Sequence, residues 1–191
     1  TWLGMIRHTL ATLGPKVQAT RMVREYVQDL YTPAAQASRA LAATAGGGEA
    51  YGPARSLAAW KARVRREWPH VRVDHVDSLG LGDAPEVGGE MQVHAFVSLG
   101  ELTPDDVEVQ ALSGRVDSED RITEAVTVPL KPAGGADQEG RWVYEGPLTL
   151  DRTGPFGYTV RVLPAHRLLA SAAELGLVAG PSQELVEAAG V

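Results

Sequence analysis

The hydrophobic period of this chain changes at Pro69, and this change constrains the fold more than any other feature. Before Pro69, apolar residues recur every three or four positions, as in amphipathic helices. After Pro69 they recur at every second position, as in strands with one buried face. The chain is therefore expected to be an α+β protein whose helices come first. Strand-like runs lie at 71–75, 91–99, 107–112, 122–130, 141–150 and 158–163.

Turn-forming residues separate these runs at regular intervals. Gly-rich and Asp-rich segments occur at 80–89, 103–106, 117–120 and 134–135. Six or seven short alternating strands with such turns are typical of an antiparallel β-sandwich. We therefore expect an immunoglobulin-like sandwich over residues 70–168, followed by a tail of short helical turns over residues 169–191.

The N-terminal part is expected to form two helices over residues 1–45. The first should end at Gly14-Pro15, since proline cannot continue a helix and glycine readily leaves one. The second should begin near Thr20 and continue past Pro33 through an Ala-rich run, until Gly46-Gly47-Gly48 ends it. The apolar stripe of this second helix consists of Met22, Val23, Tyr26, Val27, Leu30 and Tyr31.

A third helix is expected within residues 46–69, after the glycine triplet. Leu57, Trp60, Val64 and Trp68 form one apolar stripe, and basic residues occupy the rest of the helix surface. Pro69 should stop this helix. Because Trp60 and Trp68 share the stripe, we expect them to be core or domain-contact residues.

Composition excludes several classes of function. The chain is 44% hydrophobic and 22% charged, as in ordinary soluble domains, and its net charge of -6 disfavours nucleic-acid binding. It has no cysteine, so disulfides and thiolate metal sites are impossible, and a cytoplasmic location is favoured. The chain opens at Thr1 within an apolar run, which we interpret as a helix already under way and thus as a piece of a longer protein.

Residues 17–31 resemble the terminal helix that closes the catalytic body of α-glucan (glycogen/maltodextrin) phosphorylases. That helix has the pattern S-x-x-R-x-I-x-x-Y-A-x-x-I-W, which Arg21, Val23, Tyr26, Leu30 and Tyr31 match in position. Segments 57–69, 99–109 and 157–164 resemble the short-type bacterial branch of the family. The resemblance therefore implies a C-terminal fragment of a bacterial short-type phosphorylase.

This resemblance implies a parent enzyme that releases α-glucose 1-phosphate from glucan with inorganic phosphate and pyridoxal 5′-phosphate. The family holds the cofactor on a lysine in a Gly-Thr-Ser-Asn-Met-Lys-like context. This chain has no asparagine, and Lys16, Lys61 and Lys131 all lie outside such a context. We therefore expect no catalytic, cofactor-binding or metal-binding residue here, and a structural role for the chain.

The expected contacts with the missing catalytic lobes involve residues from both helical regions. A rival hypothesis is a carbohydrate-binding module, in which Trp142 and Tyr144 on one strand face would form a small glucan platform; burial of this pair in the sandwich is the alternative. A third hypothesis is an oligomerisation module. The predicted domain-interface residues are Arg21, Met22, Tyr26, Leu30, Tyr31, Trp60 and Trp68.

Histidine and acidic side chains offer weaker candidates. His70 and His75, with Asp74 between them, are the only close set, but the two histidines should point to opposite faces of a strand unless a bulge intervenes. The pairs Asp105-Asp106 and Glu119-Asp120 could suggest paired carboxylates. Both pairs lie in turn contexts, so we expect solvated turn residues.

Overall fold

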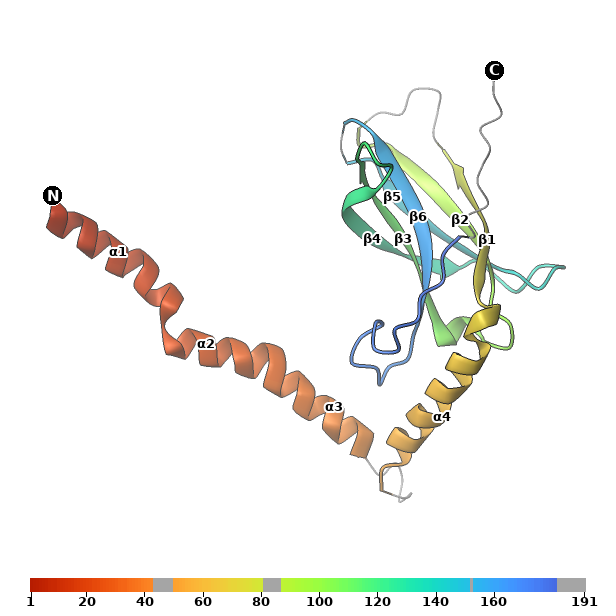
Figure 1. The fold of residues 1–191 in the computed structure, drawn as a ribbon, viewed down its shortest axis with the longest axis horizontal. Helices are drawn as coiled ribbons and strands as arrows, with labels where there is room; N and C mark the ends of the chain where they lie inside the picture. Colours follow the sequence, from red (N-terminus) through yellow and green to blue (C-terminus); the bar gives the residue numbers. More distant parts are fainter. Residues whose placement is uncertain (43–49, 81–86, 152, 182–191) are drawn as a thin grey trace. The chain divides into compact units, whose positions relative to one another are not determined.

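The structure is a computed structural model that describes residues 1–42, 50–80, 87–151 and 153–181 of the chain. The chain divides into two compact units, Thr1–Ala58 and Ala59–Val191, which are described separately (Figure 1). Within the described ranges, no helix combines the length and apolarity needed to cross a bilayer.

The first unit begins with α1 (Trp2–Val17), which is one turn longer than the sequence predicted. The expected break at Gly14-Pro15 is wrong, because Pro15 lies inside the helix. A proline near the end of a helix removes only one backbone hydrogen bond, so the chain continues to Val17 and leaves helical geometry at Gln18, with φ −69° and ψ 137°. The next helix, α2 (Ala19–Glu25), starts within one residue of the expected position.

Helical structure then continues past Pro33, as predicted. A π-helical turn, η1 (Tyr26–Tyr31), leads directly into α3 (Thr32–Ala42). The backbone N–H of Thr32 donates to the carbonyl oxygen of Val27, five residues earlier. This wider turn fits a proline in the next residue, since a proline ring clashes with the carbonyl four residues before it in a regular α-helix. The predicted helix end at 46–48 lies outside the described residues.

The third predicted helix is α4 (Gly52–Glu67), followed by a 3₁₀ turn, η3 (Trp68–His70). The α-helix ends two residues before Pro69, which sits inside the 3₁₀ turn. Within the second unit, Trp60, Val64 and Trp68 are buried, as the helical stripe predicted.

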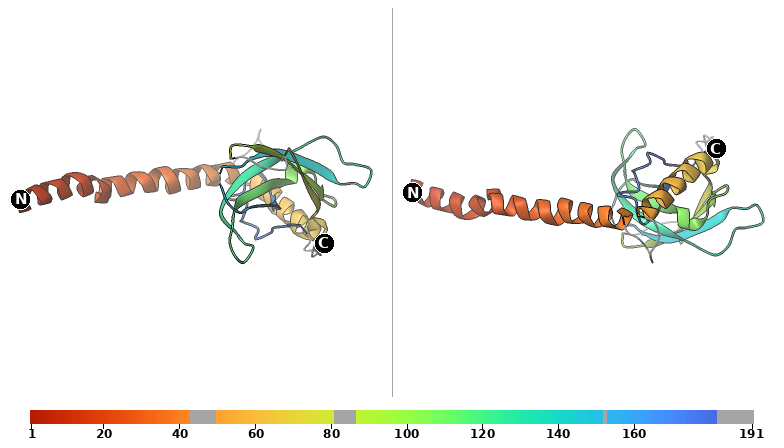
Figure 2. Two further views of the ribbon diagram at one scale, coloured as in Figure 1. Left: turned by 90° about the horizontal axis from the view of Figure 1, so that it is seen from above. Right: turned by 90° about the horizontal axis from the view of Figure 1, so that it is seen from below.

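The second unit contains one curled, antiparallel sheet of six strands in the order β1-β2-β5-β4-β3-β6 (Figures 1 and 2). Every predicted strand run corresponds to one of these strands. The strands are β1 (Arg72–Leu79), β2 (Glu90–Ser98), β3 (Val107–Val116), β4 (Ile122–Pro132), β5 (Trp142–Thr149) and β6 (Phe156–Pro164).

Strand β4 joins the two halves of the sheet. It pairs with β3 over most of its length, but only Lys131 and Pro132 pair with β5. At the outer edges, Ala179 pairs with Val162 of β6 and Pro181 pairs with Val73 of β1. The described pairing therefore forms one curled sheet, and the finer prediction of an immunoglobulin-like sandwich is not established by it.

The interior of the curled sheet is formed by alternate residues of its strands, as the period of two predicted. On β2, Met91, Val93, Ala95 and Val97 are fully buried, while the residues between them face outward. Strands β3, β5 and β6 contribute further fully buried residues, which are Val109, Ala111, Leu148, Val160 and Val162.

Candidate functional site: a helix clamp and a polar pocket

A buried carboxylate, Asp106, connects α4 to the turn before β3. Asp106 is 5% exposed and lies in the 3₁₀ turn η4 (Pro104–Asp106). The Nε1–H of Trp60 donates to its Oδ1 at 2.7 Å, and Arg63 donates to Oδ1 at 2.6 Å and to Oδ2 at 3.1 Å. These three bonds tie two successive turns of α4 to one side chain; we call this arrangement the Asp106 clamp.

The turn itself supplies the remaining partners of the carboxylate. Thr103 donates to Asp106 Oδ2 from its backbone nitrogen at 2.9 Å and from its hydroxyl at 3.0 Å. The expectation that both Asp105 and Asp106 are solvated is wrong for Asp106, whereas Asp105 is exposed. Sequence reasoning missed the clamp because Arg63 is 43 residues away in the chain and no local pattern joins it to Asp106.

The clamp holds Asp106 in its charged form. Burial would by itself raise the pKa of this carboxyl group, but hydrogen bonds from Arg63, Thr103 and Trp60 together outweigh burial, so the pKa lies below its ordinary value. A carboxylate that is ionised at neutral pH and whose oxygens accept five hydrogen bonds is suited to structure rather than to proton transfer.

Helix α4 also contacts the segment after β6. Lys61 forms an ion pair with Glu174, and Glu174 Oε2 accepts a hydrogen bond from the backbone N–H of Ala170 at 2.7 Å. The hydrogen bond from Lys61 is the main cause of a lowered pKa at Glu174. The ring of His166 lies 4.8 Å from the ring of Trp60. The C-terminal turns therefore contact α4 through Lys61 and through Trp60, which is also part of the clamp.

The predicted aromatic glucan platform is not exposed in this structure. Tyr144 is 2% exposed, and Trp142, two residues earlier on β5, is half-buried. Among the residues that the structure describes, none hydrogen-bonds the Tyr144 hydroxyl, and burial raises its pKa to about 12. Nε1 of the buried Trp68 also has no partner within this part of the chain. The burial of Tyr144 favours the structural hypothesis, and a glucan contact at this pair stays a prediction.

The predicted interface residues of the first unit lie on an exposed helix surface. Arg21 pairs with Glu25 at 2.6 Å and donates to the backbone of Lys16. None of the residues of α1, α2, η1 and α3 is buried. The exposed apolar side chains include Met22, Tyr26, Leu30 and Tyr31, of which Met22 is 45% and Tyr31 62% exposed.

Two hairpin loops, at 117–121 and 137–141, share one sequence pattern, Asp-x-Glu-x-Arg, and one hydrogen-bond pattern. Oδ1 of Asp117 accepts from the backbone nitrogens two and four residues later at 2.9 and 3.0 Å. Oδ1 of Asp137 does the same at 2.9 and 2.9 Å. In both loops the final arginine donates from Nε to the aspartate Oδ2. We call these segments the twin turns; no repeat was expected from the sequence.

The twin turns differ in what their arginines reach. Arg121 is largely exposed, whereas Arg141 lies over the ring of Phe96, 5.3 Å from its centroid. Backbone hydrogen bonds are the main cause of a lowered pKa at the first aspartate of each turn. The second twin turn thereby places Arg141 on the outer face of the sheet, beside the ends of β1 and β2.

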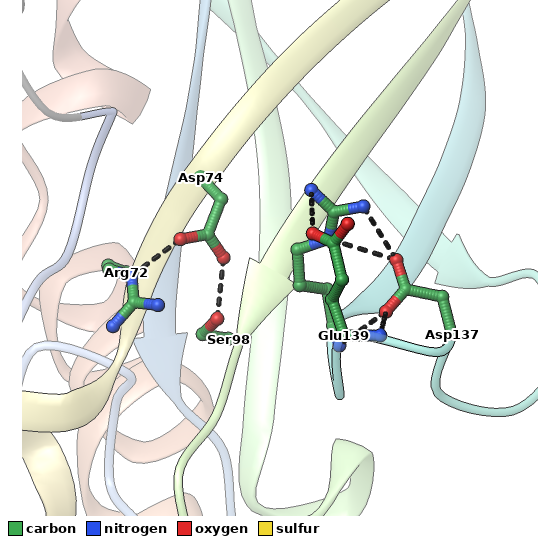
Figure 3. A network of polar contacts seen from close by, with 6 residues as sticks. Arg72, Asp74, Ser98, Asp137 and Glu139 are labelled. Atoms are coloured by element: carbon green, nitrogen blue, oxygen red, sulfur yellow. Dashed lines mark hydrogen bonds and ion pairs between the residues drawn. The ribbon is translucent and has the colours of Figure 1, made fainter.

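A polar pocket of about 350 Å³ lies beside this second turn. Figure 3 shows its neighbourhood, in which Asp74 accepts hydrogen bonds from Arg72 and Ser98 at the ends of β1 and β2, near Asp137 and Glu139 of the turn. The residues that line the pocket are Glu67, His70, Arg72, Ser98, Gly100, Glu101 and Gly140.

The predicted histidine set does not assemble into a metal centre. The strand register shifts between Val73 and His75, so the bulge that a shared metal would require is present. Even so, no group of three or more His, Cys, Asp or Glu side chains suited to a metal ion occurs among residues 1–42, 50–80, 87–151 and 153–181. His75 contacts Asp77 at 2.6 Å, and His70 lies at the pocket instead.

Comparison with known proteins identifies the family. Residues 68–182 match the model of the glycogen phosphorylase C-terminal domain. Glycogen phosphorylases of Mycobacterium bovis and Mycobacterium tuberculosis are each 46% identical over 177 residues, and the match covers 93% of this chain and 20% of theirs. A maltodextrin phosphorylase of Thermococcus litoralis is 27% identical over 186 residues, with the same coverage.

No solved structure matches the chain significantly. The chain spans about a fifth of the length of the curated relatives that it matches. The sequence resemblance and the family match agree over the six-stranded sheet, from Trp68 onward. This chain belongs to the glycogen phosphorylase C-terminal domain family.

Proposed function

We propose that this chain is the non-catalytic, structural C-terminal domain of a bacterial α-1,4-glucan phosphorylase. The parent enzyme would cleave the terminal glucosyl unit of a glucan with inorganic phosphate and release α-glucose 1-phosphate. The family match and the names of the relatives support the parent reaction. The Asp106 clamp, a buried anion with five hydrogen bonds and no free proton-transfer site, carries the structural assignment.

Pyridoxal 5′-phosphate would belong to the remainder of the parent enzyme. A lysine that forms a Schiff base needs a lowered pKa, which an apolar pocket or a cationic neighbour supplies. Lys16 and Lys131 are exposed, and the amine of Lys61 is held in an ion pair with Glu174. The lysines of this chain therefore do not fit the cofactor, and no step of the reaction is assigned to them.

The apolar stripe of the first unit would dock on the catalytic lobes of the parent enzyme, whose cytoplasmic location we also propose. Exposed contiguous apolar surface of this kind marks an interaction site. The relatives are about five times as long as this chain, so the parent provides ample protein to cover the stripe. The crossing helices would then set the geometry of lobe closure, which excludes water from the reaction.

The immunoglobulin-like sandwich is a further proposal about the second unit. It is supported by antiparallel pairing throughout and by the narrow connection between the two halves of the sheet at Lys131 and Pro132. An experimental structure would test it through the strand order of the two packed layers.

The structural assignment is tested by a charge placed on the apolar stripe. Leu30→Lys is compared in the isolated chain and in the full-length enzyme, with exposed Glu119→Lys as the control. In the isolated chain we expect no change in melting temperature, because Leu30 is already exposed. In the full-length enzyme we expect Leu30→Lys to lower the melting temperature and the rate of glucose 1-phosphate release. Equal behaviour of the two variants in the full-length enzyme would contradict docking of the stripe.

A second experiment tests the non-catalytic assignment. The isolated chain is incubated with pyridoxal 5′-phosphate and borohydride, and labelled lysines are mapped by mass spectrometry. We expect no lysine to be labelled above the level of the unfolded chain. Selective labelling of Lys16, Lys61 or Lys131, with a Schiff-base absorbance band, would overturn the assignment.

A carbohydrate-binding role remains the second candidate. It does not depend on Trp142 and Tyr144, whose rings are not exposed side by side. The observation that favours it is the polar pocket beside the second twin turn.

A further inference from the structure

The wall of the polar pocket is held in place by hydrogen bonds within the protein. Asp74 accepts one bond from Nε of Arg72 and one from the hydroxyl of Ser98, and so fixes both side chains (Figure 3). Glu67, which is buried, accepts a bond from Arg66 at 2.8 Å. Preformed polar walls lower the conformational entropy lost on binding a ligand.

Other polar groups on the same wall remain available to a ligand. Within the part of the chain that the structure describes, the two terminal nitrogens of Arg72, Nε2 of His70 and the carboxylate of Glu101 have no hydrogen-bond partner. The arginine can only donate hydrogen bonds, and the carboxylate can only accept them. A ligand that satisfies both groups must carry acceptors and donors at short spacing.

The charges around the pocket disfavour simple ions. The carboxylate of Glu101 would repel phosphate and other anions, and Glu67 is already ion-paired with Arg66. The guanidinium of Arg72 would repel a metal cation, and no metal cluster forms among the described residues. A neutral ligand with several hydroxyl groups avoids both costs, because each hydroxyl both donates and accepts.

Two glycines keep the pocket open. Gly100 has φ +59°, and a Cβ there would lie 2.9 Å from Cβ of His70. Gly140 has φ +77°, and a Cβ there would meet no atom within 4 Å, so a side chain at this position would occupy open space beside the pocket. The volume of about 350 Å³ lies within the range of roughly 300–1,000 Å³ that is common for small-molecule sites.

We propose that this pocket binds the hydroxyl groups of a neutral sugar, in the form of a short stretch of an α-glucan chain. The polyhydroxyl class follows from the wall itself, and the choice of α-glucan rests on the proposed function. Such a site, away from the reaction centre, would retain a long glucan near the parent enzyme and raise its effective concentration there.

The test uses the complete 191-residue chain and maltoheptaose as the probe. Backbone amide shifts are followed by NMR up to millimolar sugar, with inorganic phosphate and magnesium chloride as separate probes. We expect maltoheptaose to shift the amides of His70, Ser98, Gly100 and Gly140, and the two salts to leave them unchanged at constant ionic strength.

Matched variants localise the binding. Gly140→Asn adds a neutral side chain at a turn position that asparagine tolerates, and Asp120→Asn places the same residue in the other twin turn. Arg72→Gln removes the guanidinium group and its charge, with Arg121→Gln as its control. We expect Arg72→Gln to weaken maltoheptaose binding by about tenfold, the effect of losing one hydrogen bond to a charged group. We expect Gly140→Asn to weaken binding through the side chain that it adds beside the pocket. We expect each control to bind like the unmodified chain.

Three results would overturn the pocket proposal. They are the absence of any shift with millimolar maltoheptaose, shifts confined to other surfaces, and equal weakening by pocket and control variants. Selective binding of phosphate or magnesium at the pocket would also overturn it. None of these outcomes affects the phosphorylase assignment, because glucose 1-phosphate release by the full-length enzyme tests that separately.

Discussion

Asp120 and Gly140 occupy the same position in two turns with the same hydrogen bonds, and both have left-handed backbone geometry. Their φ angles are 56° and 77°. The residues before them, Glu119 and Glu139, donate their backbone N–H groups to the side chain of the aspartate that begins each turn. The backbone N–H of Asp120 donates to the carbonyl oxygen of Asp117, and that of Gly140 donates to the carbonyl oxygen of Asp137. Because the geometry is repeated, each turn can serve as the control for substitutions in the other.

The first prediction compares Gly140→Ala with Asp120→Gly. Gly140→Ala should lower the free energy of unfolding by about 1 kcal/mol, because alanine pays a steric cost at positive φ that glycine does not. Asp120→Gly should change the free energy of unfolding by less than about 0.5 kcal/mol. Glycine relieves the backbone strain of a non-glycine residue at positive φ, but it also raises the conformational entropy of the unfolded chain, and the two effects oppose each other. Urea denaturation measures both. A larger loss for Asp120→Gly than for Gly140→Ala would show that the turns are not equivalent.

The second prediction concerns the Asp106 clamp. Asp106→Asn should lower the free energy of unfolding by about 1–3 kcal/mol, because it weakens charge-assisted hydrogen bonds at a buried site. Asp105→Asn, at the exposed neighbour, should cost less than about 0.5 kcal/mol. Chemical denaturation at neutral pH distinguishes the two. Equal effects would indicate that the clamp does not stabilise the folded chain.

The third prediction is the pH dependence of the same clamp. The pKa of Asp106 in the folded chain lies below its ordinary value of 3.8. Its stabilising contribution is therefore complete above the ordinary pKa and is lost as the pH falls through the lower folded pKa. Melting temperatures measured from pH 7 to pH 2 should fall in acid, and the fall should be shallower for Asp106→Asn. Parallel curves for the two proteins would contradict this.

The fourth prediction uses the unpartnered hydroxyl of Tyr144. Tyr144→Phe should leave the free energy of unfolding unchanged at neutral pH or raise it by up to about 1 kcal/mol, because it removes a buried group that has no hydrogen bond to the described part of the chain. The folded pKa is raised to about 12. The unmodified chain should therefore lose stability as the pH rises above 10, more steeply than Tyr144→Phe. If both proteins lost stability equally steeply above pH 10, the phenol of Tyr144 would be reaching solvent.

The fifth prediction separates packing from hydrogen bonding at Trp60. Trp60→Ala should lower the free energy of unfolding by about 3–5 kcal/mol, as for other buried aromatic truncations. Trp60→Phe keeps a ring beside His166 but loses the bond to Asp106, so its cost should be about 1–3 kcal/mol. In the full-length enzyme, glucose 1-phosphate release per folded molecule should be unchanged. A selective loss of activity on long glucans, with an unchanged melting temperature, would make Trp60 a sugar contact.

Local sequence patterns predicted the elements of this chain well. The alternation of residues 91–99 identified β2 and its buried face, and the stripe of Trp60, Val64 and Trp68 identified the buried side of α4. The predicted end at Gly14-Pro15 failed, because a single lost hydrogen bond near a helix end is tolerated. The twin turns could have been recognised from the repeated Asp-x-Glu-x-Arg pattern, in which the aspartate caps the loop locally.

The sequence by itself determined where helices and strands form, since period, turn residues and propensity act over a few neighbouring residues. Only the tertiary structure decided the strand order and the narrow connection of β4 to β5, because pairing depends on contacts between distant segments. It also decided that Asp106 is buried and clamped, since its partners lie 43 and 46 residues away on α4. The polar pocket likewise depends on three chain segments that meet only after folding, at 67–72, 98–101 and 140.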